Sequence, residues 1–170
     1  MKSAAKAALF FPMNIYRMAF RVGANGVELW PTCKELGIAA ITYEALSETD
    51  LSKYPPKEPR SLWAQLASSQ VSSLSAVAYE MKKGDVIYVK QGPEIVGRGV
   101  VQGGYVFDSP ARITDANDVD WPHTVPVAWE RYFLPVKLAL GSNQRATVER
   151  LKADDLKELY AAIGKNPDAD

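Results

Sequence analysis

The chain has 170 residues, of which 47% are hydrophobic and 24% charged, proportions typical of an ordinary globular protein with enough sequence for one domain. Twenty basic and twenty acidic side chains give a formal net charge of zero, so no strong overall field favours nucleic acid or membrane. One cysteine and one histidine exclude an internal disulfide and a zinc site built from these two residue types alone. A single thiol fits a reducing, cytoplasmic location.

The charges are unevenly distributed along the chain. Residues 1–27 carry four basic side chains and no acidic one, whereas residues 108–120 carry four aspartates against Arg112 alone. The neutral total is therefore compatible with one basic and one acidic face, or with ordinary solvated surfaces. The apolar run "AALFF" at 7–11 is too short for a signal peptide, and we expect no transmembrane segment.

The first predicted strand is "IYRMAFRV" at residues 15–22, in which large apolar side chains alternate with basic or small ones. "GANG" ends this strand. The next segment, "VELWPTCKELG", predicts a short helix with Pro31 in its first turn and Gly37 at its end. An apolar strand at 38–44 and a loop at 47–59, rich in turn-forming residues, follow.

Residues 60–82 predict one helix, because apolar side chains recur there at three- and four-residue spacing. "VIYVK" at 86–90 predicts a strand and "QGPE" a hairpin turn. The returning strand, "IVGRGVVQGGYVF", contains Gly97 and Gly99, which indicate a bend, a bulge or the close approach of another group. After the acidic loop, "TVPVAWERYF" and "PVKLAL" predict two further strands.

Near the C-terminus, residues 148–151 predict a turn and residues 153–163 a helix, with Asp154 or Asp155 as its cap. The order of elements favours an α+β fold with a small, strongly bent sheet or barrel. We expect the chain to divide into a lead-in at 1–14, one domain at 15–140, a C-terminal extension at 141–164 whose helix packs on the domain, and a disordered tail at 165–170.

The sequence holds little that points to catalysis. It has no phosphate-binding loop, dinucleotide fingerprint, nucleophile elbow or metal-binding constellation, and we expect neither cofactor nor metal. An enzymatic interpretation, as a hydrolase, rests on Asp50, Glu44 and His123, none of which has an identifiable partner. The backbone of "GANG" offers N–H groups for an anion or a polar edge, or simply makes a turn.

Aromatic side chains carry more information. Trp30, Tyr43, Trp121 and Trp129 fall at the ends of predicted elements or in loops, whereas Trp63 lies within a helical stripe and is expected in the core. Large rings at such ends form stacking platforms for a planar ligand, or they plug the ends of a small barrel. The sequence leaves both interpretations open.

In chain order, a glycine-broken first strand is followed by "CKELGIAAITYE", "MKKGDVIYVKQG", "IVGRGVV" and "WPHTVPVAW". This series, which covers most of residues 15–140, resembles the EVE-like group of PUA-like domains. These are relatives of YTH domains and of the specificity modules of modification-dependent restriction systems. The resemblance implies a bent barrel of five or six strands with flanking helices, and a pocket in which aromatic rings hold a base flipped out of its strand.

The same resemblance implies particular residues by their matching positions. It implies a ligand site of Asn25 and Gly26 at the pocket lip, Tyr43 and Trp129 as cage aromatics, Trp30 as a further wall, and Lys90, Gln91, Trp121 and His123 as neighbours. Contacts to the nucleic-acid backbone are expected from Arg17, Arg21, Lys82, Lys83 and Arg98. Tyr43 stands where the family often has tryptophan.

We therefore expect a non-enzymatic module that reads a modified, methylated base in DNA or RNA, with a nuclease or other effector encoded separately. Flipping a base costs a few kcal/mol, and stacking on an aromatic ring returns about 1–3 kcal/mol per base. Three alternatives remain: a small-molecule or nucleotide-binding domain on the same scaffold, a hydrolase, and a protein that docks a partner through its acidic loop.

Overall fold

The computed structural model describes residues 13–21, 28–56, 60–138 and 147–164 of the chain. Asn25, Gly26, most of the expected lead-in and the expected tail at 165–170 lie outside these residues, so what the sequence predicts for them stays a prediction. Within the described ranges, no helix is long and apolar enough to cross a membrane.

The described part of the chain contains eight strands, four α-helices and three tighter or wider helical turns. The strands are β1 (Ile15–Met18), β2 (Ile38–Ile41), β3 (Val86–Gln91), β4 (Glu94–Val101), β5 (Val106–Phe107), β6 (His123–Trp129), β7 (Val136–Lys137) and β8 (Val148–Arg150). The α-helices are α1 (Trp30–Leu36), α2 (Arg60–Trp63), α3 (Ser68–Ser75) and α4 (Ala153–Gly164). The helical turns are the 3-10 segments η1 (Glu44–Leu46) and η2 (Leu51–Lys53) and the π-helical η3 (Ala76–Glu80).

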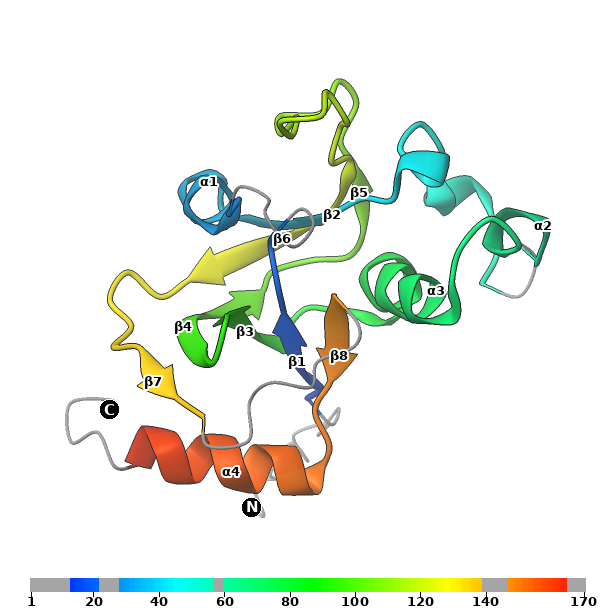
Figure 1. Ribbon diagram of the computed structural model, residues 1–170. Coiled ribbons are helices and arrows are strands. Elements are labelled where there is room, and N and C mark those ends of the chain that lie inside the picture. Colours follow the sequence, from blue (N-terminus) through cyan, green and yellow to red (C-terminus); the bar gives the residue numbers. More distant parts are fainter. Residues whose placement is uncertain (1–12, 22–27, 57–59, 139–146, 165–170) are drawn as a thin grey trace, which may run out of the picture.

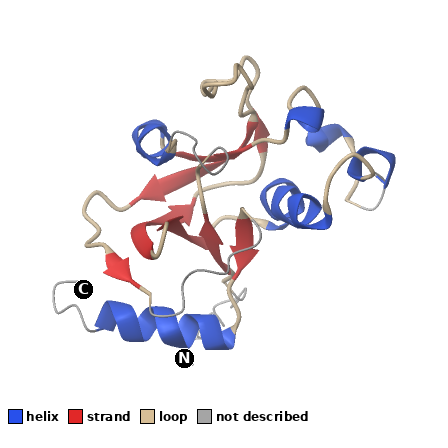
Figure 2. Ribbon diagram, viewed as in Figure 1, coloured by secondary structure: helices blue, strands red, loops and turns tan. Residues whose placement is uncertain are grey.

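The strands form one strongly curled sheet in the order β2-β6-β4-β3-β1-β8, with β5 beside β6 and β7 beside β4. β1 and β3 run parallel, and the remaining pairs are antiparallel. Figure 1 shows the sheet as a half-barrel, with α1 beside β2, α3 next to β8, and α4 across the end where β7 and β8 lie. Figure 2 shows the same view with helices, strands and loops in separate colours. The predicted α+β class with a small, strongly bent sheet and flanking helices is confirmed.

Two local predictions are confirmed at the residues that set the backbone. Pro31 lies in the first turn of α1, and Gly37 ends that helix at φ 67° in the left-handed conformation, which glycine adopts without steric cost. The β3–β4 hairpin turns through Gly92, whose φ is 59°. Its two-residue loop joins the Gln91–Glu94 pair of the ladder.

The prediction of one continuous helix at 60–82 is wrong, because non-helical residues separate α2 from α3. Ala67 is extended at the start of α3, and the Gln70 side chain accepts a hydrogen bond from its N–H at 2.9 Å. This bond satisfies one of the backbone donors that a new helix start leaves open. The apolar spacing is preserved on both sides of the break, so the sequence pattern did not reveal it.

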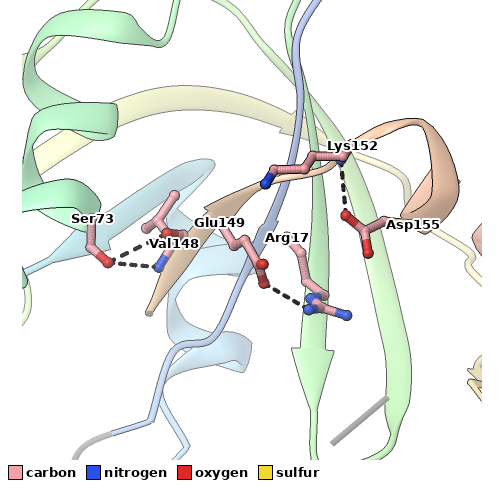
Figure 3. A network of polar contacts seen from close by, with 6 residues as sticks. All are labelled: Arg17, Ser73, Val148, Glu149, Lys152 and Asp155. Carbon is pink, nitrogen blue, oxygen red and sulfur yellow. Dashed lines mark hydrogen bonds and ion pairs between the residues drawn. The ribbon is translucent and has the colours of Figure 1, made fainter. Parts of the chain in front are cut away.

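The turn predicted at 148–151 is also wrong, because residues Val148–Arg150 form β8. This strand pairs antiparallel with β1, and the Ser73 hydroxyl of α3 contacts the backbone of Val148 on its other side (Figure 3). Arg17 of β1 lies opposite Glu149 in the ladder, and its Nη2 is 2.7 Å from the Glu149 carboxylate. All three partners are distant in sequence, so local pattern could not identify the strand.

The buried apolar side chains form two clusters on either side of the curled sheet. The larger lies inside the curl and includes side chains of α1, α3 and most of the strands. The smaller lies on the outer side of β1, β3 and β4, and Leu159 of α4 is 2% exposed within it. Asp155 accepts a hydrogen bond from the Lys152 N–H at 2.9 Å and so caps the start of α4, as the sequence predicts (Figure 3).

The "GD" pair that precedes β3 has a structural role. Gly84 has φ 96°, which few other residues adopt. The buried carboxylate of Asp85 accepts hydrogen bonds from the N–H groups of Asn14 and Lys82, each at 3.0 Å, and from the Lys82 ammonium at 3.1 Å. The pair therefore joins the start of β3 to the start of β1.

Candidate functional site

A cavity of about 390 Å³ lies where the end of β2, the acidic loop and the residue before β8 meet. We call it the Tyr43 cavity. Its lining residues are Arg21, Ile41, Thr42, Tyr43, Glu44, Asp115, Asn117, Val119, Trp121 and Thr147. Small-ligand pockets span roughly 300–1,000 Å³, so this volume suits a ligand of modest size. Four of the residues singled out in the sequence meet here: Arg21, Tyr43, Glu44 and Trp121.

The acidic loop is organised around the Asp115 carboxylate. One oxygen accepts hydrogen bonds from the N–H groups of Asn117 at 2.8 Å and Val119 at 3.2 Å, and the other accepts the indole N–H of Trp121 at 3.0 Å. Burial raises the pKa of Asp115, but the Trp121 and backbone hydrogen bonds outweigh it, so the pKa lies below its usual value. The carboxylate stays ionised and fixes Trp121 as a cavity wall.

The opposite wall comes from the end of β2. Tyr43 is half-buried, and its hydroxyl donates a 3.3 Å hydrogen bond to Oγ1 of Thr147. The neighbouring Thr42 also lines the cavity, and its hydroxyl oxygen is buried with no hydrogen-bond partner among the described residues. A buried hydroxyl without a partner is costly, so it is a feature that a ligand can relieve.

Trp30 and Trp129 do not line the Tyr43 cavity, which corrects the cage expected from the sequence. With Phe20 they form a group that we call the tryptophan cluster, in which the two tryptophan rings meet edge to face at 4.5 Å. Trp30 is 8% exposed, and the Trp129 indole N–H donates to the Ile38 carbonyl at 3.1 Å. Their rings pack over Gly97 and Gly99, where a Cβ would overlap them. Both tryptophans therefore serve packing.

His123 is fully buried and belongs to the packing as well. Its Nε2 lies 2.8 Å from the Leu46 carbonyl, which can only accept, so Nε2 carries the proton. Nδ1 then accepts from the Tyr105 hydroxyl at 2.7 Å. Burial lowers the pKa of His123, which keeps the ring neutral. Protein groups therefore occupy both ring nitrogens, and His123 does not line the Tyr43 cavity.

The other acid–base candidates also have local partners or stand alone. The Asp50 carboxylate accepts from the Ser52 N–H at 3.0 Å and from the Ser52 hydroxyl at 2.6 Å, and thereby caps η2. Glu44 lines the Tyr43 cavity but is exposed. Within the ranges that the structure covers, no three side chains of histidine, cysteine, aspartate or glutamate gather closely enough to hold a metal ion.

Most of the basic side chains expected to contact a nucleic-acid backbone form ion pairs. Arg17 pairs with Glu149 at 2.7 Å, Lys82 with Asp85 at 3.1 Å and Arg98 with Glu130 at 2.6 Å. Lys83 and Gln91 are exposed, and neither they nor Lys90 line the Tyr43 cavity. Burial and the nearby Arg17 lower the pKa of Lys90. Arg21 is the one member of the basic set that lines this cavity.

The sequence did not indicate six residues of the cavity wall, which carry no motif. They come from three separate segments and are Ile41, Thr42, Asp115, Asn117, Val119 and Thr147. The sequence signal for this wall is the acidic loop, in which four aspartates at 108–120 precede Trp121. A buried indole N–H usually has a hydrogen-bond acceptor, and a nearby carboxylate can supply it.

A family model described as a domain of unknown function, DUF8426, matches residues 17–152. The matched span contains every residue that lines the Tyr43 cavity, and it ends at the residue before α4. No curated protein matches the sequence.

Proposed function

The chain belongs to the DUF8426 family, and we propose that its domain is a non-enzymatic nucleic-acid-binding module that accepts a modified, methylated base in the Tyr43 cavity. One observation carries this proposal: Tyr43, Trp121 and Arg21, which are distant from one another in the sequence, line one cavity of suitable volume. On this proposal the half-barrel is a PUA-like domain of the EVE-like group, related to YTH domains.

The cavity supplies the interactions that such a ligand needs. A base flipped from its strand loses a few kcal/mol of stacking and pairing, and stacking on Tyr43 would return about 1–3 kcal/mol. Ile41 and Val119 give the wall apolar surface, where a methyl group adds about 0.8 kcal/mol. A methyl group can therefore convert marginal binding into useful binding.

Polar groups around the cavity suit the edge of a base and its phosphate. Glu44 presents an exposed carboxylate acceptor, and the Thr42 hydroxyl has no protein partner in the described part of the chain. Arg21 places an exposed guanidinium at the same cavity, where it suits a phosphate. With a formal net charge of zero, the domain should bind unmodified strands weakly and in a salt-sensitive way.

The proposed partners follow from the same role. The module would act in the cytoplasm on DNA or RNA that carries the modification, and a separately encoded nuclease or other effector would respond to the bound state. It performs no chemistry on the base itself.

The test is the affinity of matched oligonucleotides, methylated or unmethylated at one base, in DNA and RNA, measured by fluorescence anisotropy. We expect Tyr43→Ala to weaken binding of the preferred methylated strand by about 5- to 150-fold, because about 1–3 kcal/mol of stacking is lost. Tyr43→Phe should bind nearly as well, since the ring is kept. Tyr54→Ala removes a tyrosine that is exposed and does not line the cavity, and it should leave the affinity unchanged.

The proposal is wrong if Tyr43→Ala binds as the wild type does, or if methylation never changes affinity. A second candidate, binding of a free nucleoside or small molecule, is favoured by the two carboxylates that line the cavity against one cation. In that case a free modified nucleoside would bind as tightly as the oligonucleotide that contains it.

A further inference from the structure

A second cavity, of about 580 Å³, is lined by residues of α4 and of the segment that joins β6 to β7. Figure 1 shows α4 and β7 at its lower left. It has no lining residue in common with the Tyr43 cavity. Two of its walls, Tyr160 and Ile163, belong to α4 and so lie beyond residue 152, where the family match ends. The remaining lining residues fall within the matched span, so α4 completes a cavity that the matched domain begins.

Aromatic rings make up much of the cavity surface. Tyr88 is 4% exposed, and the ring of Phe133 meets it edge to face at 6.5 Å. Tyr132 and Tyr160 are 82% and 49% exposed, although they are large rings. Rings grouped in this way around a concave surface suit a planar aromatic ligand, which can stack on them or meet their edges.

Two guanidinium groups lie among these rings. Arg98 donates through Nη1 to Glu130 at 2.6 Å and through Nε to the Tyr88 hydroxyl at 3.3 Å. An arginine has five N–H donors, so Nη2 and one Nη1 hydrogen are left without an acceptor in the described part of the chain. Arg131 is exposed, and its guanidinium lies 5.4 Å from the Tyr132 ring centroid.

The charged side chains that line the cavity favour an anionic ligand. Arg98 and Arg131 face one carboxylate, that of Glu130, so the lining carries an excess of one positive charge. An anionic group can take up the open donors of Arg98 in charge-assisted hydrogen bonds, whereas a cationic ligand would be repelled. The aromatic surface and the guanidinium donors lie in one cavity, so a single ligand can use both.

We propose that this cavity is a second binding site, for a small planar aromatic molecule that bears one carboxylate or phosphate group. The aromatic body packs against Tyr88, Phe133 and Tyr160, and the anionic group binds Arg98 and Arg131. The site is separate from the Tyr43 cavity and does not depend on what binds there.

Three naphthalene derivatives serve as probes: 2-naphthoate, 2-naphthyl phosphate and the neutral 2-naphthalenemethanol. Titrations followed by amide NMR shifts should show the two anions perturbing residues 130–136 and α4, with at least fivefold higher affinity than the neutral probe. The tighter of the two anions distinguishes a carboxylate ligand from a phosphate one, such as a nucleotide.

Variants test each half of the site. Tyr160→Ala should weaken all three probes, and Arg131→Met should reduce the preference for the anions. Tyr54→Ala and Arg112→Met are matched controls, because both residues are exposed and lie outside the cavity. Tyr43→Ala should leave naphthoate binding unchanged, so failure of this site and failure of the proposed function are distinguishable.

Three results would overturn the proposal. The neutral probe binding as tightly as the anions would remove the role of the arginines. Decanoate binding more tightly than naphthoate would show that the site prefers an aliphatic chain. Self-association of the protein that Tyr132→Ala abolishes would show that this face is an interface between two copies.

Discussion

The tryptophan cluster and the Tyr43 cavity use the same kinds of residue, but the first is closed and the second is open. In the cluster, edge-to-face rings at 4.5 and 6.0 Å fill the space that Gly97 and Gly99 leave on β4. In the cavity, the hydrogen bond to Asp115 fixes the position of the Trp121 indole. Among the described residues, no ring contact joins Trp121 to Tyr43. Aromatic residues at the ends of elements thus separate into rings that pack against one another and rings that line a cavity.

The two regions also differ in how their polar groups are satisfied. The Trp129 indole N–H in the tryptophan cluster donates to a backbone carbonyl, and both ring nitrogens of the buried His123 also have partners. The hydrogen-bonding groups of these packed rings are therefore satisfied within the protein. The open side retains the unpartnered hydroxyl of Thr42. We therefore expect substitutions in the cluster to reduce stability, and substitutions in the cavity to change binding with little loss of stability.

The largest expected effect is that of Trp30→Ala. Removing this buried ring should lower the free energy of unfolding by about 3–5 kcal/mol, because the truncation leaves a cavity against Phe20 and Trp129. Urea unfolding monitored by circular dichroism gives the value. Tyr43→Ala is the comparison, since that ring is half-buried. Equal losses for the two variants would contradict the distinction between a closed and an open region.

The next effect is that of Gly97→Ala, which adds one methyl group where the Trp30 ring lies. Overpacking should lower the free energy of unfolding by about 1–3 kcal/mol, because either the ring or β4 must shift. Gly104→Ala is the matched control, since a Cβ there meets nothing within 4 Å. If the two alanine variants unfold at the same urea concentration, the ring does not depend on the glycine.

A pH effect is expected from His123, the single histidine of the chain. Burial lowers its pKa in the folded state, so the unfolded chain binds more protons at pH values below about 6.5. Stability is therefore fully present above the unfolded pKa and falls as the pH decreases below it, by at most about 1.4 kcal/mol per pH unit.

Urea unfolding between pH 7.5 and pH 5 measures the slope, and the imidazole NMR signal gives the pKa directly. The Tyr105→Phe variant removes the hydroxyl that donates to Nδ1, so it should cost a further hydrogen bond, about 0.5–1.5 kcal/mol. A folded-state pKa at or above 6.5 would show that the ring is not held neutral by burial.

The sequence predicts the elements that single residues control. Pro31 and Gly37 delimit α1, and Gly92 places the β3–β4 hairpin, because each restricts or permits a particular backbone conformation. β8 and the break before α3 depend on tertiary partners and on one glutamine, so no local pattern predicts them.

The sequence predicts less of the candidate site. Tyr43, Trp121, Trp30 and Trp129 all lie at the ends of elements, and their positions along the chain do not distinguish them. What separates them is three-dimensional: the ladder pairs Trp129 with Gly99, whereas the Asp115 carboxylate lies next to Trp121 only after the acidic loop has folded. The acidic loop, for which the sequence predicts neither helix nor strand, supplies much of the cavity wall.

The smallest effect on stability, and the sharpest test of the open region, is expected from Thr42→Val. The substitution keeps the shape of the side chain and removes a buried hydroxyl that has no partner in the described part of the chain. The free energy of unfolding should stay the same or rise by up to about 1 kcal/mol, because an unsatisfied polar group is lost. Binding of the preferred methylated oligonucleotide should nevertheless weaken by about fivefold, since a hydrogen bond to a ligand contributes about 1 kcal/mol.

Val125→Thr, in the closed core, is the reverse control and should be destabilising without a change in affinity. A loss of stability for Thr42→Val would mean that the hydroxyl supports the fold, and the open cavity would then resemble the closed cluster.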